Sequence, residues 1–299
     1  MKWIIDTDFS TNSQQAIDLL IKNNLDIVAF TVVVDFSKNH PLDIKNKMLE
    51  YFKQKYNKEF NVYVGAQESY IDYSEELGDS KLEDPYNVSD YKVKLRSSTE
   101  SRNYVPDLDN VACIKIAELI NTYGKELSIL SLSSLTNISL AIILDNSINN
   151  KFDKLVVTGG SSTGKGNSGV FSEANFRADP VAAKNVIKYF KNIVVVPMEA
   201  EISFHNLFKT DSKELRSLNE YVTAALKDKK SILQLISALY VLNNNVASGL
   251  ISQLADIDIV GKLTRGAFSI IKYEWLNNDE YNKITYFEEL NKEEVMKLL

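Results

Sequence analysis

The chain has 299 residues, of which 44% are hydrophobic and 25% charged, with a formal net charge of −6 at pH 7. These values are typical of a soluble globular protein, and the acidic balance argues against a nucleic-acid partner, since such proteins usually carry a basic face. We see no run of about 18 apolar residues, so no membrane span is predicted. Met1–Asp6 turns acidic too soon for a signal peptide. Cys113 is the single cysteine, which excludes an intrachain disulfide and favours a cytoplasmic location.

Apolar runs alternate with segments of helical periodicity along most of the chain. In chain order, we predict a strand at Trp3–Asp6, a helix at Asn12–Leu20, a strand at Leu25–Val34, a helix at Ile44–Lys55, a strand at Phe60–Val64, a helix at Asn110–Tyr123, a strand at Leu127–Leu132, a helix at Leu135–Leu144, a strand at Lys154–Thr158, a helix at Pro180–Tyr189, a strand at Ile193–Pro197, helices at Lys213–Leu226 and Ser231–Leu242, a strand near Ile284–Tyr286 and a helix at Lys292–Leu299. This alternation predicts an α/β fold: a Rossmann-like, mostly parallel central sheet flanked by helices. No linker divides the chain, so we expect one domain over residues 1–299.

The alternation weakens over residues 65–107, which are rich in Ser, Asp, Glu and Tyr. We interpret this stretch as a long, lid-like surface excursion, because loops of this length are often functional. Its tyrosines could stack on a flat ligand or pack the loop against the body of the protein, and we favour packing. They are Tyr70, Tyr73, Tyr86, Tyr91 and Tyr104.

Three polar segments follow predicted strands: residues 6–8, 133–137 and 159–175. In open α/β sheets, ligands bind outside the carboxyl ends of the strands. The expected position of these segments at the carboxyl ends of the strands therefore predicts one pocket built from all three.

Together these segments resemble the inosine-uridine nucleoside hydrolase family, whose members open with Asp-x-Asp-Pro-Gly-x-Asp-Asp after the first strand. Further family motifs are Gly-Pro-Leu-Thr-Asn, Gly-Asn, Ala-Glu-Phe-Asn and Asp-Pro-Glu-Ala-Ala, followed by a turn near the end of the chain. The corresponding segments here, in the same order and over nearly the whole chain, are Asp6–Ser13, Ser133–Asn137, Gly166–Asn167, Ser172–Asn175, Asp179–Ala183 and Leu263–Gly266.

The resemblance implies cleavage of the N-glycosidic bond of ribonucleosides through an oxocarbenium-like transition state. In the family, a calcium ion orients the ribose hydroxyls and a water, and an aspartate takes the proton of that water. Family members are often dimers or tetramers, so the resemblance also implies a homo-oligomer.

Part of the family site is retained. Asn167, Glu173 and Asn175 match the residues that the family places around the ribose 5′-hydroxyl, although a polar loop that caps the next helix would look similar. Asp6 and Asp8 match the first two family aspartates, and Asp8 stands where the family has a metal ligand that also acts as the base. The alternative to these roles is that the two acids lie near helix N-termini because negative charge is favourable there.

Other positions of the calcium site have changed. The next two family aspartates are Asn12, at a ribose-binding position, and Ser13, at a bidentate metal position. The late His-Asp pair of the family aligns with Gln234 and Leu235, and Thr136 could still offer a backbone carbonyl. Because calcium takes about 6–8 oxygens, usually with several carboxylates, we expect no functional calcium site and no other metal here.

Groups that could act on a base are also sparse. His40 and His205 match no catalytic histidine of the family, and we interpret both as surface or structural residues. The family loop His-Gly-x-x-Gly-Leu-Gly survives only as Leu77–Gly78, with Asp72 in place of the histidine.

Three functions follow from this pattern. The first is a protein that binds a nucleoside or ribosyl ligand and has lost or altered the calcium-dependent hydrolysis, which is our main expectation. The second is an active N-ribosyl hydrolase that works without metal or on a modified nucleoside, with Asp8 as base and a new cation such as Lys38 or Lys165 at the site. The third is a non-catalytic scaffold or regulatory subunit.

Overall fold

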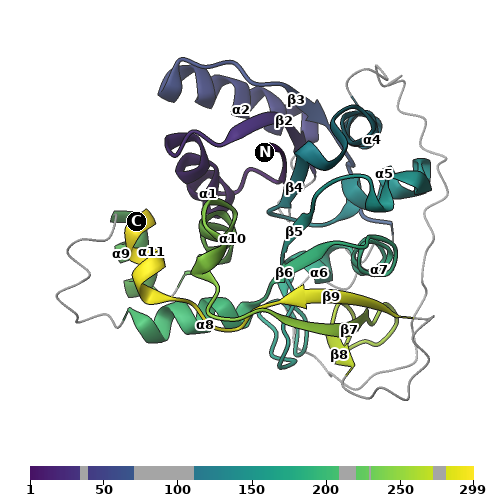
Figure 1. The fold of residues 1–299 in the computed structure, drawn as a ribbon, viewed down its shortest axis with the longest axis vertical. Helices are drawn as coiled ribbons and strands as arrows, with labels where there is room; N and C mark the ends of the chain where they lie inside the picture. The colour runs from purple at the N-terminus through teal and green to yellow at the C-terminus, as the bar shows by residue number, and fades with distance from the viewer. Residues whose placement is uncertain (34–39, 71–110, 209–219, 229, 272–280) are drawn as a thin grey trace, which may run out of the picture.

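The computed structural model describes residues 1–33, 40–70, 111–208, 220–228, 230–271 and 281–299. Nine strands in these residues form one sheet, in the order β3-β2-β1-β4-β5-β6-β9-β7-β8 (Figure 1). The strands are β1 (Lys2–Thr7), β2 (Asp26–Val32), β3 (Val62–Val64), β4 (Leu127–Ser131), β5 (Leu155–Thr158), β6 (Ile193–Val196), β7 (Ile251–Ile257), β8 (Phe268–Ile271) and β9 (Asn282–Tyr286).

Most of this sheet is parallel. Every pairing from β3 through to β9 is parallel, whereas β7 runs antiparallel to both β9 and β8. Strand β1 lies between β2 and β4, so Asp6 pairs with Thr31 on one side and Ser131 on the other. The predicted single α/β domain with a mostly parallel sheet is confirmed.

Helices cover both faces of the sheet, as Figure 1 shows. The helices that pack on one face are α1 (Thr11–Lys22), α2 (Pro41–Tyr56), α8 (Met198–Leu207), α9 (Glu220–Asp228), α10 (Leu233–Leu242) and α11 (Lys292–Leu298). Those on the other face are α4 (Ala112–Tyr123), α5 (Thr136–Leu144), α7 (Pro180–Tyr189) and the short α6 (Ala174–Ala178). None of the helices in this described part of the chain is long and apolar enough to cross a bilayer.

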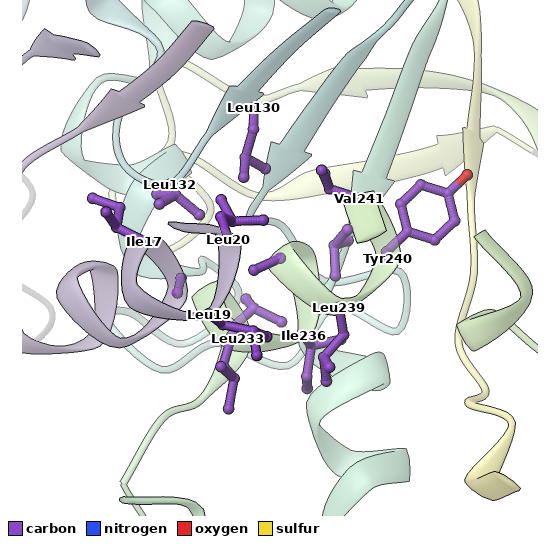
Figure 2. Close-up of a cluster of buried hydrophobic side chains, with 14 of the residues drawn as sticks. Ile17, Leu19, Leu20, Leu130, Leu132, Leu233, Ile236, Leu239, Tyr240 and Val241 are labelled. Carbon is purple, nitrogen blue, oxygen red and sulfur yellow. The ribbon is translucent and has the colours of Figure 1, made fainter. Parts of the chain in front are cut away.

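Helices α1 and α10 pack against each other beside the carboxyl ends of the central strands. Figure 2 shows Ile17 and Leu20 of α1 in one cluster with Ile236 and Leu239 of α10 and Leu130 of β4. All five side chains are buried. Apolar residues three or four apart form one face of a helix, which is why both helices turn this face to the sheet.

Four elements have no counterpart in the sequence prediction: α6, α8, β7 and β8. Helix α8 contains the buried Glu199, which interrupts the apolar periodicity that reveals most helices. Strand β7 is half-exposed along most of its length, so its pattern lacks a continuous apolar run. Of the excursion at 65–107, only residues 65–70 are described, and the start of the helix predicted at Lys213–Leu226 also lies outside the described residues.

Candidate functional site

The three polar segments meet at one edge of the sheet. Strands β1, β4 and β5 are neighbours and run parallel, so Thr7, Ser131 and Thr158 end them at the same edge. The segments that follow, residues 8–13, 132–137 and 159–175, therefore share that edge. The arrangement agrees with the general position of ligand sites in open α/β sheets.

Asp8 is held by the turn between β1 and α1. Its Oδ1 accepts hydrogen bonds from the Ser10 amide at 3.0 Å and from the Ser13 hydroxyl at 2.8 Å. The Ser13 hydroxyl also lies 3.1 Å from the Ser10 hydroxyl, and Ser13 is fully buried. Among the described residues, nothing donates a hydrogen bond to Asp8 Oδ2. One oxygen of Asp8 is therefore occupied and the other remains available.

Phe9 gives this turn an unusual backbone. It has a φ of 54°, in the left-handed region that L-residues other than Gly rarely adopt. Its amide donates to the Thr7 hydroxyl at 2.9 Å, and its ring packs edge-on against Tyr51 and Phe52 of α2. Packing of the buried ring offsets the cost of the backbone conformation, and it holds Asp8 at the end of β1.

Asp6, two residues before Asp8 in strand β1, is fully buried. Its Oδ1 accepts hydrogen bonds from the Thr31 hydroxyl at 2.6 Å and from Asn137 Nδ2 at 2.8 Å, while its buried Oδ2 has no hydrogen-bond partner. Burial raises the pKa of Asp6 to about 7, against the lowering effect of these two hydrogen bonds. Asp6 therefore ties β1, β2 and α5 together at the edge.

The segment after β4 meets the first turn of α10. Gln234 Nε2 donates to the Leu132 carbonyl at 3.4 Å, and the buried Gln234 Oε1 has no partner. Leu235 is buried in the apolar cluster between α1 and α10. Thr136 is the first residue of α5, and its hydroxyl donates to Asp179 Oδ2 at 2.8 Å. The backbone carbonyl that Gln234 contacts at this edge is therefore that of Leu132 and not that of Thr136.

Asn167, Glu173 and Asn175 are positioned by backbone hydrogen bonds in the loop after β5. Asn167 Oδ1 accepts from the Ala174 amide at 2.9 Å, and Asn175 Nδ2 donates to the Thr158 carbonyl at 2.9 Å. Among the described residues, Asn167 Nδ2, Glu173 Oε1 and Asn175 Oδ1 make no hydrogen bond. Each side chain therefore uses one polar atom for contacts within the fold and has another without a partner in the described residues.

Glu173 is the N-cap of α6. Its Oε2 accepts from the amides of Asn175 at 2.9 Å, Gly160 at 3.1 Å and Phe176 at 3.2 Å. Burial raises the pKa of Glu173 to about 7, the three amides oppose this rise, and the nearby Glu201 adds to it. The capping role that we weighed against ligand binding is therefore present, and it engages only one of the two oxygens.

Two acidic residues of α8 belong to the same edge, and sequence reasoning missed both. Glu199 is buried and accepts from the hydroxyls of Ser161 at 2.8 Å and Thr163 at 2.6 Å, which fixes the turn after β5. Glu201 accepts from the Ser231 hydroxyl at 3.0 Å and the Ile232 amide at 2.8 Å. The sequence signal was a Glu-x-Glu pair directly after a predicted strand, at 199–201.

A third residue that sequence reasoning missed, Tyr221 of α9, reaches the β1–α1 turn. Its hydroxyl donates to Asn12 Oδ1 at 2.8 Å. Burial raises the pKa of Tyr221, and Glu201 raises it further. Glu201 contributes to the raised pKa of both Tyr221 and Glu173, so its carboxylate lies close enough to interact electrostatically with both groups.

The remaining candidates either make other contacts, are exposed, or lie outside the described residues. The Tyr70 hydroxyl lies 3.1 Å from that of Ser139, and its ring packs on the core beside α4 and α5, which agrees with a packing role. His40 caps α2, and His205 lies 3.8 Å from Glu201. Lys165 is exposed. The residues outside the described ranges are Lys38, Asp72, Tyr73, Leu77, Gly78, Tyr86, Tyr91 and Tyr104.

Within the described ranges, no three or more His, Cys, Asp or Glu side chains form a group that could hold a metal ion. Among the described residues, the polar atoms without a partner at the edge include Asp8 Oδ2, Asn12 Nδ2, Gln234 Oε1 and atoms of the 167–175 loop. Such an arrangement can bind a polyhydroxylated ligand through hydrogen bonds, and Asp8 could accept a proton.

Solved structures of nucleoside hydrolases share this fold. A plant nucleoside hydrolase superposes with a TM-score of 0.71 at 18% identity, over 99% of this chain and 96% of that one. A purine-preferring ribonucleoside hydrolase from Gardnerella vaginalis superposes with a TM-score of 0.68 at 17% identity, over 100% and 98% of the two chains. At these identities the likeness shows the fold alone.

Sequence comparison shows the family. Uridine nucleosidase 1 of Arabidopsis thaliana is 40% identical over 79 residues, which cover 26% of this chain and 24% of that protein. Probable uridine nucleosidase 2 of Oryza sativa subsp. japonica is 38% identical over 92 residues, or 31% and 27% of the two chains. These matches cover only about a quarter of either relative. The family profile described as inosine-uridine preferring nucleoside hydrolase matches residues 3–297, and the chain therefore belongs to that family.

Proposed function

We propose that this protein binds a nucleoside or another ribosyl ligand at the carboxyl edge of β1, β4 and β5, and that it lacks calcium-dependent hydrolysis. The observation that carries the proposal is the hydrogen bond from the Ser13 hydroxyl to Asp8 Oδ1. This hydrogen bond gives Asp8 Oδ1 a neutral donor as its partner, whereas in a calcium site that oxygen would coordinate the ion.

The residues at this edge do not fit a resident calcium ion. Calcium takes about 6–8 oxygens, and its affinity falls as carboxylates are removed. Asp8 offers one oxygen, Asp6 is fully buried, and the Ser13 hydroxyl is already engaged. Leu235 is apolar and buried, and the Leu132 carbonyl accepts from Gln234. These contacts support a site without calcium and, we propose, without any metal cofactor.

The ligand would be held from two sides. Asn167 Nδ2, Glu173 Oε1 and Asn175 Oδ1 supply one donor and two acceptors on the side of β5. Asp8 Oδ2 and Asn12 supply polar atoms on the side of β1. Hydroxyl groups both donate and accept, so a sugar can satisfy this mixed set.

A second function is hydrolysis of an N-ribosyl bond without metal, which the open Asp8 Oδ2 favours. Asp8 would take a proton from water as the water oxygen bonds to the anomeric carbon. The bond from that carbon to the base nitrogen would break, and the base would leave with the electron pair and take a proton from solvent. A scaffold or regulatory subunit is the non-catalytic alternative. We further propose that the protein is cytoplasmic, forms a homo-oligomer and binds no nucleic acid.

Calorimetric titration with ribose, uridine and inosine in chelator tests the proposal. We expect binding of at least one compound, weakened about fivefold by Asn167→Ala, because one hydrogen bond is worth about 1 kcal/mol. The matched control is Asn121→Ala, an exposed residue near the end of α4, which should bind normally. Absence of binding by all three, or binding only with calcium, would overturn the proposal.

A further inference from the structure

We infer that Tyr221 is a positioning residue that fixes the hydrogen-bonding polarity of Asn12, so that Asn12 presents its NH₂ group to the ligand. This inference rests on the proposed ribosyl-binding function and specifies the ligand chemistry of the same site. The oxygen that faces Asn12 then acts as an acceptor, which means that the site admits ribosyl ligands whose hydroxyl at this position is blocked as an ether.

The amide of Asn12 could in principle present either end. An amide side chain has an oxygen that accepts and an NH₂ group that donates, and a free amide can turn between them. Here the Tyr221 hydroxyl donates to Asn12 Oδ1 at 2.8 Å. No acceptor among the described residues bonds Asn12 Nδ2. With its oxygen engaged, the group that Asn12 has left to offer is a donor.

Tyr221 is suited to hold this orientation. Tyr221 is half-buried, and burial together with Glu201 raises its pKa, so its hydroxyl stays protonated at neutral pH. It comes from α9, whose Val222, Ala225 and Leu226 are buried in the core on the same side as α1. The contact between Tyr221 and Asn12 is therefore anchored at both ends by packed helices.

Asn12 lies at the same edge of the sheet as Asp8. Asn12 precedes Ser13, whose hydroxyl bonds Asp8, in the first turn of α1. That turn contains no acidic side chain. A carboxylate in place of Asn12 would offer only acceptors and would require a hydroxyl that donates, whereas Asn12 requires only an oxygen that accepts.

The test compares hydroxyl, deoxy and O-methyl forms of one nucleoside. Calorimetry with uridine and its 2′-deoxy and 3′-deoxy forms first identifies the hydroxyl whose loss weakens binding by about tenfold. The O-methyl ether at that position is then measured against uridine in the wild type, Tyr221→Phe and Asn12→Asp. Tyr189→Phe is the control, because Tyr189 is exposed at the end of α7 on the opposite face.

We expect the ratio of the dissociation constants of the ether and of uridine to rise about fivefold or more in Tyr221→Phe, because the freed amide can turn its oxygen to the ligand. Asn12→Asp should raise the same ratio, and Tyr189→Phe should leave it unchanged. A purely structural role of Tyr221 would weaken both ligands equally and leave the ratio constant. That result overturns this inference alone, whereas failure of every ribosyl compound to bind the wild type overturns the proposed function with it.

Discussion

The Ser13 hydroxyl donates a hydrogen bond to Oδ1 of Asp8 across a distance of 2.8 Å, and both residues are buried. Ser13 lies five positions after Asp8 in sequence, and the β1–α1 turn folds the first turn of α1 back over the end of β1. Oδ1 of Asp8 therefore has its hydrogen bonds from the Ser13 hydroxyl and the Ser10 amide, and it does not need a metal ion or a ligand as a partner. We base the following expectations on this contact and on the other hydrogen bonds at the edge.

Ser13→Asp should create a dependence on calcium that the wild type lacks. The new carboxylate would lie against Asp8, and two buried like charges should lower the free energy of unfolding by about 1–3 kcal/mol in chelator. Calcium should recover part of this loss, because a pair of carboxylates is a better ligand set for the ion. Thermal melts with chelator and with millimolar calcium measure both effects.

Thr11→Asp is the matched control for this substitution. Thr11 is exposed in the same turn of α1, where an added acid suits the positive end of the helix. We expect melts of this variant that do not respond to calcium. A wild-type melt that shifts upward by several degrees with calcium would refute our interpretation of the edge.

Glu173 should make the stability of the protein depend on pH between about pH 4.5 and 7. Burial raises its pKa from 4.5 to about 7, so its contribution is complete below pH 4.5 and is lost as pH rises through 7. Glu173→Gln keeps an acceptor for the three amides and removes the ionisation. This variant should gain up to about 3 kcal/mol relative to the wild type above pH 7, compared with the same difference below pH 4.5.

Urea denaturation of both proteins across this pH range provides the comparison. Asp6 has a pKa of about 7 as well and contributes in the same window, so the wild-type slope should be reduced in Glu173→Gln and not abolished. Identical slopes in the two proteins would show that Glu173 is ionised in the folded protein throughout the range.

Asp179 should anchor residues 66–70 to the edge of the sheet. It accepts from the Tyr70 amide at 3.1 Å, the Thr136 hydroxyl at 2.8 Å and the Ala182 amide at 3.1 Å. Asp179→Ala removes the cap of α7, the buried hydrogen bond from Thr136 and the part-buried one from Tyr70, so we expect a loss of about 2–4 kcal/mol in unfolding free energy.

Hydrogen exchange at the Tyr70 amide separates the two roles of Asp179. Asp179→Asn keeps an oxygen for the Ala182 amide but places an NH₂ group against Tyr70. We expect faster exchange at Tyr70 in both variants and a smaller loss of stability in Asp179→Asn. Unchanged exchange in Asp179→Ala would show that the segment is held by other contacts.

The fold was largely predictable from the sequence because a parallel sheet buried on both faces produces continuous apolar runs. Ile193–Val196 is such a run, and Leu127–Ser131 is buried throughout although two of its residues are serines; each appears as a strand almost where expected. Strand β7 and helix α8 escaped prediction because half-exposed or acidic positions interrupt their patterns.

The site was predictable in position but not in detail. Motif order located Asp8, Asn12 and the 167–175 loop, and strand polarity predicted that they share an edge. The contact of Tyr221 with Asn12 joins residues 209 positions apart, and the contact of Gln234 with Leu132 joins residues 102 apart. Neither leaves a local pattern, so only the packing of α9 and α10 reveals them.

Release of reducing sugar from a panel of ribonucleosides, measured with added calcium and again with chelator, tests the central claim most directly. We predict that chelator makes no difference: either no sugar is released by a folded preparation, or release continues unchanged and depends on Asp8. Release that chelator abolishes and calcium restores would contradict the account, because it would require a working calcium site at an edge where Ser13 and Leu235 offer no carboxylate.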